Sequence, residues 1–133
     1  REGRILQEII NNDGLEIFCG LEENYICSLK CKGFVIATGG SVVYSEKAMT
    51  HLMKNSVTVH LDLTFPVLEK RVSDMDSRGI VIAPEQTFSG LYQERNPLYR
   101  TYSDITVDCE GLSHEQVVYA VIKDLDDFSE KDK

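Results

Sequence analysis

A short apolar run that ends in two glycines constrains the fold more than any other part of this sequence. Phe34–Thr38 is almost entirely apolar, and Gly39, Gly40 and Ser41 follow it directly. Such a run is typical of a buried strand in a parallel sheet, where ligands lie at the carboxyl ends of the strands. Because glycine has no Cβ atom, Gly39 and Gly40 allow a ligand to approach the backbone. The alternative is that these glycines only shape a strand–helix turn.

Segments with strand and helix patterns alternate along the rest of the chain. Val57–Leu63 alternates apolar and polar residues as a half-buried strand does, and Ile105–Cys109 is a further short strand. Apolar residues at helical spacing predict helices between and around the strands. The predicted helices cover about 5–10, 15–29, 48–53, 66–72, 91–99 and 113–122. This alternation predicts an α/β fold with a parallel sheet of three strands, which is few for such a sheet.

Composition limits the possible functions. A chain of 133 residues is expected to form one domain around one core. The net charge of −8 argues against a nucleic-acid-binding surface, and no apolar run approaches the roughly 20 residues of a membrane span. The four cysteines lack the spacing of a zinc site and are expected to be reduced thiols of a cytoplasmic protein. The three histidines are scattered, so we predict no metal site among them.

Several motifs occur in an order that resembles the shikimate kinase family. Members of this family are small P-loop phosphotransferases. The matching motifs are, in chain order, Val35–Gly40, Val59–Leu63, Leu68 with Arg71, Arg78, Glu94–Tyr99 and Ser103–Asp108. The resemblance extends from Glu2 to about Leu125. It implies a three-layer P-loop kinase-like fold with a parallel sheet over residues 1–128, a lid at about 73–86, and a disordered tail at 129–133.

The resemblance also implies parts that these 133 residues do not contain. Family members open with a strand, a Gly-x-x-Gly-x-Gly-Lys-Ser/Thr loop and a second strand. No Gly-Lys-Ser or Gly-Lys-Thr occurs in this sequence. Since the chain begins with Arg1, we expect these parts to lie upstream in a longer product, and the 133 residues alone to fold poorly and to be inactive. The alternatives are a natural remnant of the fold, or another segment in the same place.

The resemblance assigns four residues to the substrate. Arg95 matches the arginine that pairs with the carboxylate of shikimate, a role that suits the two parallel donors of a guanidinium. Gly39 and Gly40 match glycines whose backbone approaches the substrate ring. Ser41 stands in place of a third glycine, and either adds a hydroxyl donor or caps the next helix. The alternative for Arg95 is an arginine that stacks on a helix or forms an ion pair across it, for instance with Glu94 or Asp104.

Two more arginines match residues near ATP. Arg78 matches a catalytic lid arginine that meets the transferring phosphoryl group, although Gly79-Ile80 replaces the usual Pro-Leu after it. Arg71 matches an arginine that contacts the nucleotide, and the Glu110–Ser113 turn matches the backbone around adenine. Plain solvated arginines are the alternative in both cases. The ligands of Mg²⁺ are expected mostly in the absent segment.

Cys19 is the strongest departure from the family pattern. The family motif Phe-Arg-x-x-Glu becomes Phe18-Cys19-Gly20-Leu21-Glu22, and its arginine shares the substrate carboxylate. Loss of one charge-assisted hydrogen bond costs about 1.5–3 kcal/mol. We therefore expect either a weaker acid site or a related hydroxy acid as substrate, and Glu22 is left without its usual partner. Gly20 weakens a helix by about 1 kcal/mol, so a local irregularity is conceivable.

These observations predict a monomeric ATP-dependent kinase for shikimate or a related small hydroxy acid, which binds neither nucleic acid nor membranes. Two alternatives remain at the level of sequence. One is a non-catalytic remnant or regulatory binding module of the same fold. The other is a sister small-molecule kinase, such as one for gluconate, which would lack the Arg-x-Pro-Leu-Tyr motif.

Overall fold

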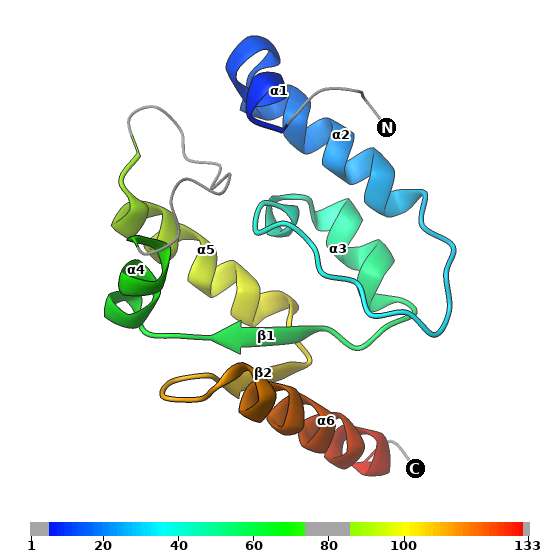
Figure 1. The fold of residues 1–133 in the computed structure, drawn as a ribbon. Helices are drawn as coiled ribbons and strands as arrows, with labels where there is room; N and C mark the ends of the chain where they lie inside the picture. The colour runs from blue at the N-terminus through cyan, green and yellow to red at the C-terminus, as the bar shows by residue number, and fades with distance from the viewer. Residues whose placement is uncertain (1–5, 74–85, 132–133) are drawn as a thin grey trace.

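The structure is a computed structural model that describes residues 6–73 and 86–131 (Figure 1). In this part of the chain, helices and strands alternate much as the sequence predicts. The elements are α1 (Leu6–Asp13), α2 (Leu15–Cys27), the short 3₁₀ helix η1 (Val42–Tyr44), α3 (Glu46–Met53), β1 (Val59–Asp62), α4 (Phe65–Ser73), α5 (Phe88–Tyr102), β2 (Ile105–Asp108) and α6 (His114–Lys131). The continuation of α5 through Pro97 and the start of α6 after Ser113 are both confirmed.

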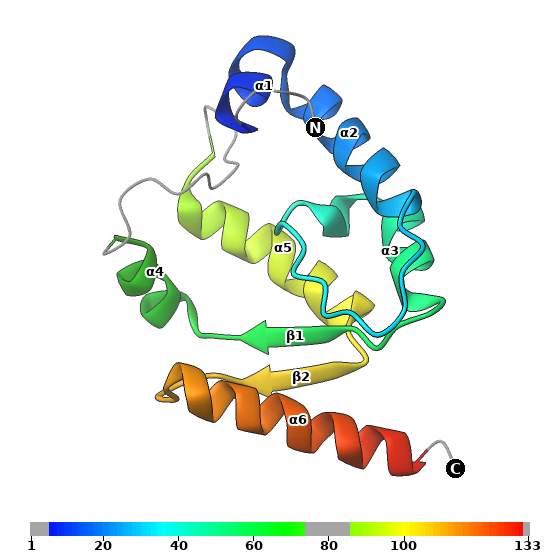
Figure 2. The ribbon, with the colours of Figure 1, turned by 45° about the vertical axis from the view of Figure 1, so that its right-hand side comes forward.

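The two strands form a parallel sheet with a helix on each face. β1 and β2 pair in parallel, with Val59 opposite Ile105 and Asp62 opposite Asp108. α6 covers one face, where buried Val107 and its neighbours pack against apolar side chains of that helix. On the other face, the ring of His60 lies 5.3 Å from the ring of Tyr99 on α5. The chain is therefore an α/β protein with three layers (Figure 2).

The prediction of a strand at Phe34–Thr38 is wrong, because no strand forms there in the structure described. This segment forms no regular secondary structure, and the side chains of Phe34 and Val35 are 74% and 101% exposed. A buried parallel strand needs neighbours along its edges, and among the described residues the ladder contains only β1 and β2. The apolar run therefore satisfies the sequence pattern of a strand without the partners that would bury it.

The expectation of a single core is also wrong for the described residues, which bury their apolar side chains in three clusters. One lies between α1 and α2, one between β2 and α6, and one joins η1 and α3 to α5 and α2. A sheet of two strands is too narrow to bring these clusters together. The third cluster positions the candidate site, because it holds the turn after Gly40 against α5.

Two smaller predictions also need correction. α6 continues through Lys131, so residues 129–131 are helical rather than part of a disordered tail. α2 runs through Gly20 as a continuous helix, so this described helix does not contain the local irregularity that the sequence left open at that glycine. None of the helices in the described ranges is both long and apolar enough to cross a membrane.

Candidate functional site

The buried side chain of Arg95 meets the glycine turn. Arg95 and Tyr99 are four residues apart on α5 and so lie on the same side of that helix. Arg95 is only 8% exposed, and its Nη1 lies 3.2 Å from the position that a Cβ atom on Gly40 would occupy. The Tyr99 hydroxyl donates to the Gly40 carbonyl over 2.8 Å. The structure thus brings together the two sequence features, the arginine and the bare backbone, that were predicted to converge.

Arg95 contacts the aromatic ring of Tyr44, so the stacking form of the alternative interpretation is present in the structure. Asp104 accepts hydrogen bonds from the backbone and the hydroxyl of Thr58, at the start of the sheet. Glu94 accepts from Gln86. The Nε of Arg95 instead donates to the hydroxyl of Tyr44 over 3.1 Å, and the guanidinium lies 5.1 Å from the centroid of the Tyr44 ring.

Ser41 and Glu22 link the glycine turn to α2. The Ser41 hydroxyl donates to Glu22 Oε2 over 2.7 Å, and Ser41 is buried. Glu22 Oε1 lies 2.8 Å from the position of a Cβ atom on Gly39. Glu22 is therefore hydrogen-bonded to Ser41 in the absence of the family arginine. Ser41 stands at the N-cap position of η1, but its side chain makes no capping hydrogen bond. The cap of α3 is Ser45, whose hydroxyl accepts from the backbone of Ala48 over 3.0 Å.

Cys19 lies one turn before Glu22 on α2 and is a neutral group in this site. Burial raises the pKa of its thiol, and the nearby Glu22 carboxylate raises it further, while Arg95 lowers it. The thiol is therefore protonated at neutral pH, and it neither adds nor removes charge. The charged side chains near this thiol include Arg95 and Glu22, and the carboxylate of Glu23 also lies at this end of α2.

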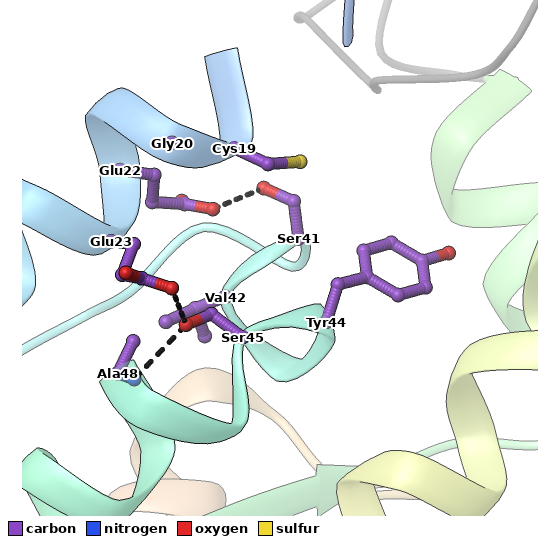
Figure 3. Close-up of a pocket in the computed structure, with 9 residues that line it drawn as sticks. All are labelled: Cys19, Gly20, Glu22, Glu23, Ser41, Val42, Tyr44, Ser45 and Ala48. Atoms are coloured by element: carbon purple, nitrogen blue, oxygen red, sulfur yellow. Dashed lines mark hydrogen bonds between the residues drawn. The ribbon is translucent and has the colours of Figure 1, made fainter. Parts of the chain in front are cut away.

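A cavity of about 140 Å³ lies between α2 and the segment 41–48 (Figure 3). Figure 3 shows Cys19 and Glu22 projecting toward Ser41, and the ring of Tyr44 pointing to the side of α5. Tyr44 thus connects the cavity wall to Arg95. Since a cavity of roughly 150 Å³ holds a benzene ring, this space suits a small molecule of that size. The Glu22 carboxylate and several hydroxyl groups line this cavity, and Arg95, which is not among the lining residues, contacts one of them, the hydroxyl of Tyr44. Such groups can orient a small polyhydroxylated acid.

Sequence reasoning missed the two tyrosines of this corner. Tyr99 could have been found, because it lies four residues after Arg95 and belongs to the same helical motif. Tyr44 could not, since only the packing of η1 on α5 brings it to Arg95.

Of the two arginines matched to ATP, the structure describes Arg71. Arg71 is an exposed residue of α4 and lies near the buried thiol of Cys109 at the carboxyl end of β2, where it lowers a pKa that burial raises. Arg78 lies outside the described residues, as does nearly all of the predicted lid. Within the described ranges, no group of three or more His, Cys, Asp or Glu side chains is placed to hold a metal ion.

Replacing Gly40 with alanine is expected to lower the free energy of unfolding by about 1–3 kcal/mol. The added Cβ would lie 2.8 Å from the Tyr99 hydroxyl and 3.2 Å from Arg95 Nη1, so both side chains must move. Gly20→Ala is the matched control: a Cβ atom there meets open space, and alanine stabilises a helix interior by about 1 kcal/mol. Chemical denaturation measures both variants, and equal stability of Gly40→Ala and the parent would contradict the packing described here.

Comparison with known proteins agrees with the motifs and the fold. A family model described as shikimate kinase matches residues 1–126. A shikimate kinase of Thermodesulfovibrio yellowstonii is 34% identical over 96% of this chain and 75% of its own length. Those of Caldanaerobacter subterraneus and Colwellia psychrerythraea are each 32% identical, over 91% and 95% of this chain and 72% and 76% of their own lengths. On this match, together with the α/β fold and its motifs, the chain belongs to the shikimate kinase family.

Proposed function

We propose that this chain forms the acid-binding part of an ATP-dependent kinase that phosphorylates a hydroxyl group of shikimate or of a related small hydroxy acid. The observation that carries this proposal is the buried guanidinium of Arg95 beside the backbone of Gly40. A cation held at a bare backbone turn, next to a cavity the size of a small ring, suits a small anionic guest.

In this proposal, the chain binds and orients the acid. Arg95 pairs with the carboxylate, and the backbone at Gly39 and Gly40 contacts the ring. The Glu22 carboxylate, held by Ser41, accepts from a donor group of the guest. Phosphoryl transfer from ATP depends mainly on positioning and on neutralisation of charge, so a fixed acid places its hydroxyl group for attack. ATP and Mg²⁺ supply the phosphoryl group and its charge neutralisation.

We further propose that the phosphate-binding loop comes from a segment outside these 133 residues. Apolar side chains stand exposed on β1 and α6: Leu61 is 53% exposed, and Val118 and Ile122 are 57% and 51% exposed. Together with the exposed Phe34 run, these surfaces suit a further strand and helix. Arg71 would then contact the nucleotide, and Arg78 would close over the phosphoryl group. The 133 residues alone would be inactive, and the whole enzyme would work in the cytoplasm.

A coupled ATP-consumption assay on the full-length product that contains these residues tests the proposal. We expect phosphoryl transfer to shikimate or to another cyclic hydroxy acid, and none from the 133-residue chain. Gluconate is the control acceptor, because a sister kinase would prefer it. ATP binding without transfer to any acid would reject the enzyme and favour a regulatory module.

A further inference from the structure

We infer that Tyr44 is a positioning residue for the acid site: its hydroxyl and its ring hold the guanidinium of Arg95 so that the Nη groups, and not Nε, receive a carboxylate. This inference rests on the proposed role of Arg95 in binding the acid. It concerns a residue outside every motif of the sequence analysis.

The geometry restricts the guanidinium in two directions. The Nε–H of Arg95 donates to the Tyr44 hydroxyl over 3.1 Å, and the ring of Tyr44 lies 5.1 Å from the guanidinium carbon. The hydrogen bond uses one edge of the planar guanidinium, and the ring contact adds a cation–π attraction. Nη1 lies 3.2 Å from the position that a Cβ atom on Gly40 would occupy, and the Tyr99 hydroxyl lies 2.8 Å from the same position. A carboxylate that arrives at the glycine turn therefore meets the Nη side of Arg95.

The chemistry of a phenol suits this task. Burial raises the pKa of the Tyr44 hydroxyl; the hydrogen bond from Arg95 lowers this pKa, and the nearby Glu94 carboxylate raises it. The phenol therefore stays neutral at physiological pH. A neutral acceptor satisfies a buried donor without cancelling its charge. An aspartate or glutamate at this position would instead neutralise Arg95 and compete with the acid. Tyr44 thus orders the guanidinium without adding a negative charge of its own beside it.

A purely structural role explains Tyr44 less well. The core cluster at this turn is built from its neighbours Val42 and Val43 with Ala48 and Met49, and Tyr44 itself is 37% exposed. The side chain points toward α5 and Arg95 (Figure 3). Tyr44→Phe keeps the ring and its packing and removes only the hydroxyl, so this variant is expected to fold.

Two measurements on the full-length protein test the inference. The first is solvent exchange of the Arg95 Nε–H, followed by NMR with ¹⁵N-labelled arginine and assigned with Arg95→Lys. We expect exchange to be about fivefold faster, or more, in Tyr44→Phe, because a hydrogen-bonded and sheltered proton exchanges slowly. Tyr119→Phe, on the exposed face of α6, is the matched control and should change nothing. Equal exchange in Tyr44→Phe and the parent would overturn the inference, whether or not the protein is a kinase.

The second measurement is calorimetric titration with shikimate and with its uncharged methyl ester. We expect Tyr44→Phe to weaken shikimate binding about tenfold and ester binding less than twofold, because only the carboxylate depends on the orientation of Arg95. In an Arg95→Met background, the same substitution should have no further effect. An equal loss for acid and ester, or a loss that persists without Arg95, would overturn the inference. If the parent does not bind shikimate at all, the proposed substrate is wrong, and the exchange measurement still decides the role of Tyr44.

Discussion

Replacement of Arg95 with methionine is expected to lower kcat/KM for the acid substrate by about 100- to 1,000-fold. The guanidinium can offer a carboxylate two charge-assisted hydrogen bonds, each of which contributes about 1.5–3 kcal/mol. Even a partial loss of these two hydrogen bonds lowers kcat/KM by two or three powers of ten, since about 1.4 kcal/mol corresponds to a tenfold change. Methionine has a similar length and fills the space of this buried side chain.

The coupled kinase assay measures this effect on the full-length enzyme. Arg95→Lys is the informative control, because lysine keeps the charge and loses the two-pronged geometry. We expect it to lie between the parent and Arg95→Met. If Arg95→Met keeps the kcat/KM of the parent while its fold is intact, Arg95 does not bind the acid and the proposed site is wrong.

Introduction of arginine at Cys19 is expected to tighten the binding of shikimate by about 10- to 100-fold, the value of one charge-assisted hydrogen bond. Cys19 lies in the cavity wall, close enough to Glu22 and Arg95 for both to affect its pKa. A guanidinium at this position would meet the same carboxylate as Arg95, and Glu22 between them would offset their repulsion. The quantity to be measured is the KM for shikimate in the kinase assay.

Cys27→Arg is the matched control for this substitution, since Cys27 lies two turns farther along the same helix. It changes the net charge equally and should leave KM unchanged. Unchanged or weaker shikimate binding in Cys19→Arg would show that the natural substrate does not place a carboxylate at this wall. A different hydroxy acid would then be sought among guests with a donor group for Glu22.

Two departures from the family pattern become one feature in the structure. Cys19 replaces an arginine and Ser41 replaces a glycine, and sequence analysis treated them separately. In the structure the Ser41 hydroxyl binds Glu22, the carboxylate expected to lose its partner when the arginine is absent. The pair of changes therefore keeps Glu22 hydrogen-bonded. The double variant Cys19→Arg with Ser41→Gly would test whether Glu22 returns to the arginine.

The periodicity of apolar residues was sufficient to locate most of the fold. The helices and the strands at Val59–Asp62 and Ile105–Asp108 appear where their patterns predict, because each pattern reflects burial of one face. Phe34–Thr38 has an equally clear strand pattern and forms no ladder in the structure described. Strand formation needs hydrogen-bonding partners from distant parts of the chain, and a local pattern contains no information about whether they are present.

The family and the α/β class could be predicted from the sequence, because they follow from motifs and from the order of elements along the chain. The contact between Arg95 and the glycine turn could be predicted from the same motifs. Only the tertiary structure decided which groups surround the guanidinium. The groups around it are the Tyr44 hydroxyl, the Glu22–Ser41 hydrogen bond and the neutral Cys19 thiol. They lie on α2, on η1 and just before η1, and the packing of these helices brings them close to α5. The orientation and the charge balance of side chains at a site depend on distances between segments that are far apart in sequence. Periodicity and motifs contain information only about neighbours along the chain.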